Sequence, residues 1–206
     1  MRKQKFILIT NHDCITAKRI SSLVEAAKGL GEILIVAPDK PQSGMGHAIT
    51  VNGPLRCTES KYFKDVKAYT TDGTPVDCVK MGIFLMKGKK PDLVISGINH
   101  GSNCSTNVLY SGTMSAAVEG ALEGIPSIGF SLLDYDMDAD FSASIKVARE
   151  IIKEALEDGI PKSVCLNVNI PKLKFDQISG YKVCRQATAF WDDSFDERKD
   201  PLGKKY

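Results

Sequence analysis

The stretch that decides the fold reads Pro91-Asp92-Leu93-Val94-Ile95-Ser96-Gly97-Ile98-Asn99-His100-Gly101-Ser102-Asn103, with Tyr110-Ser111-Gly112-Thr113 shortly after it. The apolar run 93–95 is typical of a buried strand, and it ends at small and amide residues. The second cluster opens a segment with apolar residues at helical spacing. Free N–H groups and the positive end of a helix dipole at such a place favour an anion. The stretch therefore predicts a phosphate site at the carboxyl ends of parallel strands.

Strands and helices alternate along most of the chain. Apolar runs predict strands at 6–10, 33–37, 92–98, 126–131 and 164–168. Helical spacing predicts helices over 20–30, 75–86, from 111 onward and over 141–156. This alternation indicates an α/β fold: a Rossmann-like, doubly wound, mainly parallel sheet flanked by helices. In such a fold, ligands bind beyond the carboxyl ends of the strands near a topological switch point.

Two segments fit the alternation less well. Residues 47–73 alternate loosely and predict a β excursion, while residues 172–206 are polar and contain one strand candidate, Tyr181-Lys182-Val183-Cys184. We expect one domain over residues 1–206, because a chain of this length is enough for one sizeable core. Residues 172–206 are expected to be a short extension or an oligomerisation segment.

The composition is that of an ordinary globular protein, and it excludes several classes. The 206 residues carry a formal net charge of +2 with both signs interspersed, so nothing favours a nucleic acid polymer as partner. The apolar run 6–9 is too short for a signal peptide, and no run is long enough to cross a membrane. We therefore expect a cytoplasmic protein. Six cysteines without a C-x-x-C pair make a structural zinc site improbable.

Polar residues follow the predicted strands and could hold a cation. Asp13 follows the first strand, and Asn11, Ser43 and Asn99 could add neutral oxygen ligands of the kind that hard divalent cations prefer. An Asp after a strand is also a common helix cap, and Ser111 could simply start a helix. The chain has no P-loop, no Gly-x-Gly-x-x-Gly after the first strand and no Gly-x-Ser-x-Gly. Nucleophilic catalysis and dinucleotide binding are therefore disfavoured.

The order of motifs resembles that of the SurE family, the stationary-phase survival nucleotidases. The matching blocks are Thr10-Asn11-x-Asp13, Val36-Ala37-Pro38-Asp39 with Gln42-Ser43-Gly44, Gly73-Thr74-Pro75 with Asp77-Cys78-Val79-Lys80, 91–99, 108–113, Ala116-Ala117-x-Glu119-Gly120, Gly124-Ile125-Pro126-Ser127 and 166–171. They cover nearly the whole chain in the same order.

The resemblance implies a metal-dependent phosphomonoesterase that hydrolyses nucleoside 5′-monophosphates with a metal-activated water. Carried onto this sequence, the ligands of the divalent cation are His12, Asp13, Ser43 and Asn99, of which Asp13 and Asn99 are also catalytic. The residues expected at the phosphate are Asn11, Ser111, Gly112 and Thr113. By resemblance the cation is Mg²⁺ or Mn²⁺.

The chain departs from the family pattern at its first metal position. The family's Asp-Asp-Gly is His12-Asp13-Cys14 here, Ala17-Lys18-Arg19 replaces Ala-Pro-Gly, and Ser115 stands where Gly is usual. An imidazole ligand favours Mn²⁺, Co²⁺ or Zn²⁺ over Mg²⁺. The chain ends at Tyr206, tens of residues earlier than family members usually do, so we expect a homodimer rather than a tetramer.

Three interpretations remain open at this point. The leading one is an active 5′-nucleotidase. The alternative is a catalytically impaired member that binds nucleotide or phosphate without efficient turnover, or a decayed copy that binds no ligand. The third is a phosphatase with a different metal that acts on another phosphomonoester.

Overall fold

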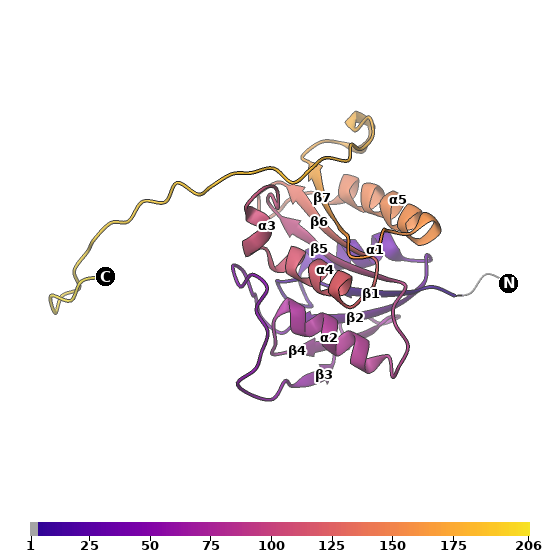
Figure 1. Cartoon of the computed structure of the whole chain (residues 1–206), viewed down its shortest axis with the longest axis horizontal. Helices are drawn as coiled ribbons and strands as arrows, with labels where there is room; N and C mark the ends of the chain where they lie inside the picture. The colour runs from indigo at the N-terminus through magenta and orange to yellow at the C-terminus, as the bar shows by residue number, and fades with distance from the viewer. Residues whose placement is uncertain (1–3) are drawn as a thin grey trace.

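The computed structural model describes residues 4–206 and contains a seven-stranded sheet with helices on both faces (Figure 1). The strands are β1 (Phe6–Thr10), β2 (Glu32–Pro38), β3 (Cys57–Glu59), β4 (Lys67–Thr71), β5 (Leu93–His100), β6 (Ser127–Leu133) and β7 (Cys165–Pro171). The helices are α1 (Lys18–Ala27), α2 (Pro75–Leu85), α3 (Asn107–Tyr110), α4 (Gly112–Leu122), α5 (Ser142–Asp158) and the 3₁₀ turn η1 (Phe175–Gln177). Each helix and strand predicted from the apolar pattern of the alternating segments is present, within about three residues at its ends.

The strand order is β3-β4-β2-β1-β5-β6-β7. All neighbours run parallel except β3 and β4, which are antiparallel. From β1 the chain first builds outward through β2 and β4, and it then returns to the other side of β1 with β5. The switch point between β1 and β5 is therefore the expected place for a ligand. The predicted doubly wound α/β fold is confirmed.

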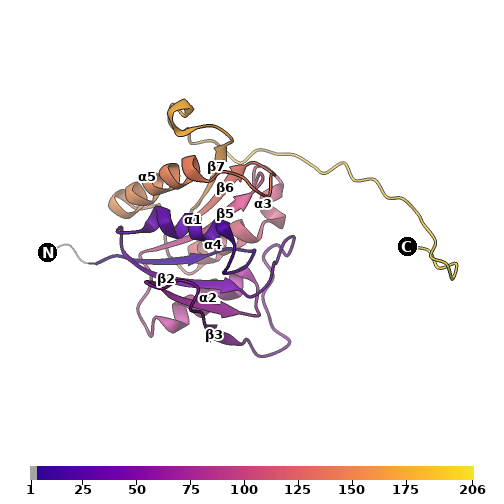
Figure 2. The same cartoon turned by 180° about the vertical axis from the view of Figure 1, so that it is seen from behind.

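The helices form two layers, with α1 and α5 on one face of the sheet and α2 and α4 on the other (Figures 1 and 2). Side chains alternate between these faces along β1. Ile7 and Ile9 join the apolar cluster under α1 and α5, while Leu8 joins the cluster under α2 and α4. Burial of both faces explains why the central strands read as continuous apolar runs rather than alternating ones.

The helix α2 begins where the sequence indicates. Thr74 accepts a hydrogen bond from the Asp77 N–H, the Asp77 carboxylate accepts one from the Thr74 N–H, and Pro75 occupies the first helical position. This reciprocal capping box satisfies donors that the helix itself leaves unpaired.

The β excursion expected over 47–73 is part of the main sheet. β4 pairs with β2 in parallel, with Leu34 opposite Lys67, and the short β3 closes the edge. β4 lies next to this edge, and only two of its five residues, Ala68 and Thr71, are buried, which explains its weak apolar pattern.

The strand expected at 181–184 is wrong. No strand forms there, because the segment has no sheet edge beside it, and every residue from 179 to 199 is exposed. The chain after η1 runs away from the sheet (Figures 1 and 2), with the Tyr181 hydroxyl donating to Glu154 Oε2 at 2.6 Å. The single-domain organisation and the oligomerisation role of 172–206 stay predictions. Within residues 4–206, no helix has the length and apolar character needed to cross a bilayer.

Candidate active site at the β1–β5 switch point

The loop after β1 packs against the start of α4. His12 is 8% exposed, and its Nδ1 lies 2.9 Å from Thr113 Oγ1. Gly112 lies so close that a Cβ atom added to it would be 2.7 Å from His12 Cβ and 3.1 Å from Pro75 Cγ. The structure therefore brings together His12, Gly112 and Thr113, three residues predicted for the site.

Ser111 serves as the cap of α4. Its Oγ accepts a hydrogen bond from the Met114 N–H at 3.1 Å, and its carbonyl accepts one from the Ser115 N–H at 2.9 Å. The first N–H groups of a helix lack partners within it, and here they belong to Gly112 and Thr113. These N–H groups and the helix dipole favour an anion beside His12. Both interpretations of Ser111, helix cap and neighbour of a phosphate, are compatible with this geometry.

Asp13 is held by Arg19, a residue to which the sequence pattern assigns no role. Arg19 Nη1 donates to Asp13 Oδ1 at 2.6 Å, and Arg19 Nη2 lies 3.4 Å from His100 Nδ1. The Asp13 side chain is 13% exposed and that of Arg19 is 19% exposed. The replacement of a family glycine by an arginine six residues after Asp13 was the sequence signal for this pair.

The His12 imidazole is neutral at neutral pH. Burial lowers its pKa most strongly, the Asp13 carboxylate raises it, and the Arg19 guanidinium lowers it again; the net direction is downward from 6.5. The 3.5 Å separation between His12 Nε2 and Asp13 Oδ1 is therefore a contact between a neutral ring and a carboxylate rather than an ion pair.

Asn99 and Ser43 lie at the same edge of the sheet. Asn99 is on β5, after a bulge in the pairing with β6, and its Nδ2 donates to Gly101 O at 2.9 Å and to Asn103 Oδ1 at 3.2 Å. Ser43 is exposed in the loop after β2, which is tied to β1 where the Gln42 N–H donates to His12 O at 2.7 Å. Within residues 4–206, no hydrogen bond or ion pair joins Ser43 or Asn99 to Asp13.

Two buried oxygens of the β1 loop lack partners within the described part of the chain. They are Asn11 Oδ1 and Asp13 Oδ2. Asn11 Nδ2 donates to Cys14 O at 2.9 Å, so the amide presents its carbonyl oxygen. Buried acceptors without a hydrogen-bond partner indicate a place for a ligand. Amide and carboxylate oxygens are the ligands that a hard divalent cation prefers. The residues present therefore fit such a cation, although residues 4–206 contain no group of three or more His, Cys, Asp or Glu placed to hold a metal.

Cys14 replaces the family glycine without backbone strain. It is absent from the non-glycine residues with positive φ, which are Lys87, Ser105 and Ser163. Its Sγ lies 3.2 Å from Thr16 Oγ1, and its carbonyl accepts hydrogen bonds from Asn11 and from the Ala17 N–H. The exchange of Gly for Cys is therefore accommodated locally.

The loop that carries Ser43 is anchored by a carboxylate on α4. Glu119 is 4% exposed and accepts hydrogen bonds from His47 Nε2 at 2.8 Å and from Lys80 at 2.5 Å. Burial alone would raise the pKa of Glu119, but the bonds from Lys80 and His47 outweigh it and hold the pKa below its ordinary value. A Glu within the otherwise small and apolar block Ala116-Ala117-x-Glu119-Gly120 was the sequence signal for this anchor.

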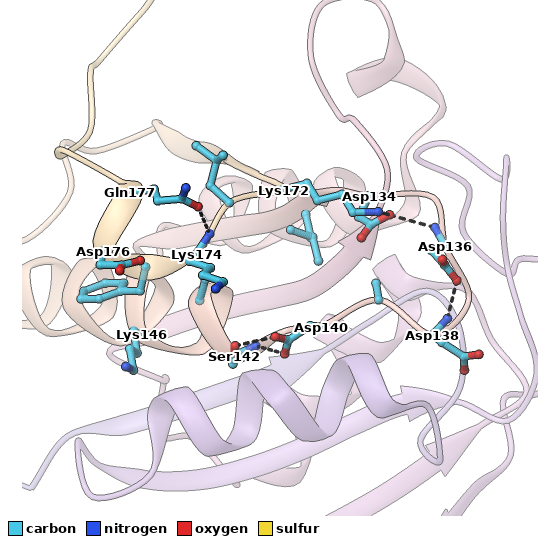
Figure 3. A pocket seen from close by; sticks show the side chains of 15 residues that line it. Asp134, Asp136, Asp138, Asp140, Ser142, Lys146, Lys172, Lys174, Asp176 and Gln177 are labelled. Carbon is cyan, nitrogen blue, oxygen red and sulfur yellow. Dashed lines mark hydrogen bonds and ion pairs between the residues drawn. The ribbon is translucent and has the colours of Figure 1, made fainter.

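A pocket of about 750 Å³ lies beyond the ends of β6 and β7 and contains none of the predicted site residues (Figure 3). Alternate aspartates line it, and the carboxylates of Asp134, Asp136 and Asp140 each accept a hydrogen bond from the backbone N–H two residues further along the chain. Lys172 pairs with Asp134 at 3.0 Å. These contacts give partners to the carboxylates of Asp134, Asp136 and Asp140.

The sequence profile of the family described as Survival protein SurE matches residues 7–193. The chain belongs to the SurE family. The resemblance inferred from the motifs is thus confirmed.

Curated relatives and a solved structure are similar to this chain over almost its whole length. A protein named 5′-nucleotidase SurE from Christiangramia forsetii is 55% identical, covering 100% of this chain and 80% of its own. One of the same name from Cytophaga hutchinsonii is 54% identical over 97% of this chain and 78% of its own. The crystal structure of the SurE protein from Aquifex aeolicus matches with a TM-score of 0.84 and 42% identity, over 98% of this chain and 80% of that one.

Proposed function

We propose that this SurE-family chain is a metal-dependent 5′-nucleotidase, which hydrolyses nucleoside 5′-monophosphates to nucleoside and phosphate. The observation that carries the proposal is the contact between the β1 loop and α4, where His12 meets Thr113 and Gly112 at the switch point of the sheet. The relatives named 5′-nucleotidase SurE support the choice of substrate.

The phosphate lies at the start of α4 in this proposal. The N–H groups of Gly112 and Thr113 donate to its oxygens, and the helix dipole stabilises its charge. His12 orients Thr113 through the 2.9 Å contact between Nδ1 and Oγ1. Asn11 was expected at the phosphate from the sequence, but its Nδ2 donates to Cys14 O and its free atom is the acceptor Oδ1, which suits the cation rather than the phosphate.

The divalent cation is assigned to His12, Asp13, Ser43 and Asn99, with the orphaned Asp13 Oδ2 as its anionic ligand. Once bound, it would lower the pKa of a water and stabilise charge on the phosphoryl oxygens. Asp13 would hold the cation through Oδ2, and Asn99 would orient the attacking water, which gives up its proton to solvent as its oxygen bonds to phosphorus and the bond to O5′ breaks. The nucleoside leaves with a proton taken from solvent.

The second candidate function is binding of nucleotide or phosphate without efficient turnover. One observation favours it: Arg19 already occupies Asp13 Oδ1 at 2.6 Å. A third candidate, hydrolysis of another phosphomonoester, uses the same groups and differs in substrate and metal.

The partner we propose besides the nucleotide is a second copy of the chain. Exposed apolar side chains on the C-terminal segment support a homodimer, and they include Tyr181, Val183, Phe190 and Phe195. Light scattering on the purified chain tests this, and a monomer at all concentrations would refute it.

The test of the function is phosphate release from a panel of nucleoside 5′- and 3′-monophosphates and other phosphomonoesters. Mg²⁺, Mn²⁺, Co²⁺ and Zn²⁺ are compared, with Asp13→Asn as the control. We expect release from 5′-monophosphates that requires a divalent cation and is lost in the control. Folded protein that releases no phosphate with any metal would refute the enzyme and favour the binding protein.

A further inference from the structure

Arg19 gives the candidate metal site a permanent positive charge. It is the second residue of α1, and its guanidinium reaches back to Asp13, with 19% and 13% of the two side chains exposed. Partial burial weakens solvent screening of the pair. An arginine also stays charged at any accessible pH. The pair is therefore a fixed feature of the site rather than a mobile surface contact.

The formal charges of Asp13 and Arg19 cancel. A divalent cation that approaches Asp13 meets a neutral pair instead of a free carboxylate, and it is repelled by the guanidinium. Of the two carboxylate oxygens, Oδ1 is already hydrogen-bonded to Arg19 and Oδ2 alone is free. Both effects lower the affinity of the site for the cation.

The same charge has the opposite effect on a phosphate. A phosphate dianion at the start of α4 is attracted by a guanidinium held beside the neighbouring loop, and guanidinium groups match phosphate oxygens well. The His12–Thr113 contact links the loop of Asp13 directly to that helix start. Arg19 thus favours the anion at the expense of the metal.

We propose that Arg19 is a charge-setting residue of the site, which weakens binding of the divalent cation to Asp13 and strengthens binding of the substrate phosphate. The proposal rests on the proposed function, since it assigns an affinity effect to the same phosphate and metal groups. A single side chain thus lowers the affinity for the divalent cation and raises the affinity for phosphate.

The experiment measures both affinities on the full-length, chelator-treated chain without turnover. Free Mn²⁺ is followed by electron paramagnetic resonance as MnCl₂ is added, and inorganic phosphate is followed by equilibrium dialysis. In Arg19→Ala we expect Mn²⁺ to bind about tenfold more tightly. Phosphate should bind about fivefold more weakly in the same variant. Arg19→Lys keeps the charge but not the guanidinium, so its Mn²⁺ affinity should stay close to wild type and its phosphate affinity should fall less than in Arg19→Ala.

Arg149→Ala is the matched control for the loss of an arginine. Arg149 donates to Ala26 O and Lys28 O at the far end of α1, so its removal should leave both affinities unchanged. Equal Mn²⁺ affinities in wild type and Arg19→Ala, undetectable Mn²⁺ binding in both, or a parallel loss of both affinities would overturn the proposal. The release assay on nucleotides judges the proposed function separately, because neither affinity measurement depends on hydrolysis.

Discussion

Gly112 packs so closely against His12 that the glycine has no room for a side chain. A Cβ atom added to Gly112 would lie 2.7 Å from the Cβ of His12. The substitution Gly112→Ala must therefore push the start of α4 away from the β1 loop. We expect a loss of about 1–3 kcal/mol in the free energy of unfolding, as for other overpacked positions. Phosphate binding should fall as well, since the N–H groups of Gly112 and Thr113 move with the helix. Chemical denaturation and equilibrium dialysis measure the two effects.

Gly53→Ala is the control for this substitution. A Cβ atom on Gly53 meets nothing within 4 Å, and the residue is exposed. The free energy of unfolding of Gly53→Ala should differ from that of wild type by less than about 0.5 kcal/mol. A Gly112→Ala protein as stable as Gly53→Ala would show that the contact between α4 and the loop is loose in solution.

A second prediction concerns the metal preference. His12→Asp adds a carboxylate beside Asp13, and hard carboxylate oxygens favour Mg²⁺. We expect the Mg²⁺ concentration for half-maximal phosphate release to fall by about tenfold relative to that for Mn²⁺. The variant also loses the contact with Thr113 Oγ1, which should cost about 1 kcal/mol of stability. An unchanged ratio of Mg²⁺ to Mn²⁺ dependence would remove His12 from the ligand set.

The alternation of apolar runs was enough to predict the doubly wound sheet, because strands buried on both faces read as continuous apolar segments. β1 and β5 could thus be placed with the polar residues that follow them. β4 could not be placed in this way, since three of its five residues are exposed or half-buried and it has no continuous apolar run. The strand expected at 181–184 was wrong for a related reason: apolar residues make a strand only where a neighbouring strand accepts their hydrogen bonds.

A third prediction separates Cys14 from Arg19. Cys14→Gly restores the family residue, but Cys14 has no positive φ to relieve. We expect the Mn²⁺ affinity to stay within about twofold of wild type, with a stability loss of about 0.5–1 kcal/mol from the greater freedom of the unfolded chain. Titration with MnCl₂ and thermal unfolding give both values. A gain in affinity comparable to that of Arg19→Ala would make the thiol, rather than the guanidinium, the obstacle to the cation.

A fourth prediction follows from the lowered pKa of Glu119. A carboxylate whose pKa is lower in the folded state stabilises the protein fully above its unfolded pKa, and this contribution disappears as the pH falls through the folded value. Wild-type stability should therefore decline below about pH 4.5, and Glu119→Gln should show less of this decline. At pH 7 the free energy of unfolding of Glu119→Gln should be about 1–2 kcal/mol lower than that of wild type, because His47 and Lys80 lose a charged partner.

The matched control here is Glu123→Gln, which removes a more exposed carboxylate that also pairs with Lys80. Its effect at pH 7 should be below about 0.5 kcal/mol. Denaturation curves between pH 3 and 7 compare the three proteins. If Glu119→Gln declined with pH as steeply as wild type, another group would be responsible for the acid sensitivity.

The candidate site was only partly predictable. The residues after β1 and before α4 could be named from motifs and spacing, and the structure places His12 against Gly112 and Thr113. The role of Arg19 could not be predicted. Arg19 lies in the first turn of α1, six residues after Asp13, and sequence spacing alone does not show that its guanidinium points back to that carboxylate. The anchor between Glu119 and His47 joins residues 72 positions apart, which sequence patterns do not connect.

Trp191 is the single tryptophan of the chain, and it lies on the C-terminal segment with 59% of its surface exposed. Its fluorescence therefore reports on whatever covers that segment and not on the packing of the sheet. An emission maximum near that of free indole is the expected signal of an uncovered segment, and a blue shift with rising protein concentration would be the optical signature of self-association. Unfolding of the sheet has to be followed by another probe, such as far-ultraviolet circular dichroism.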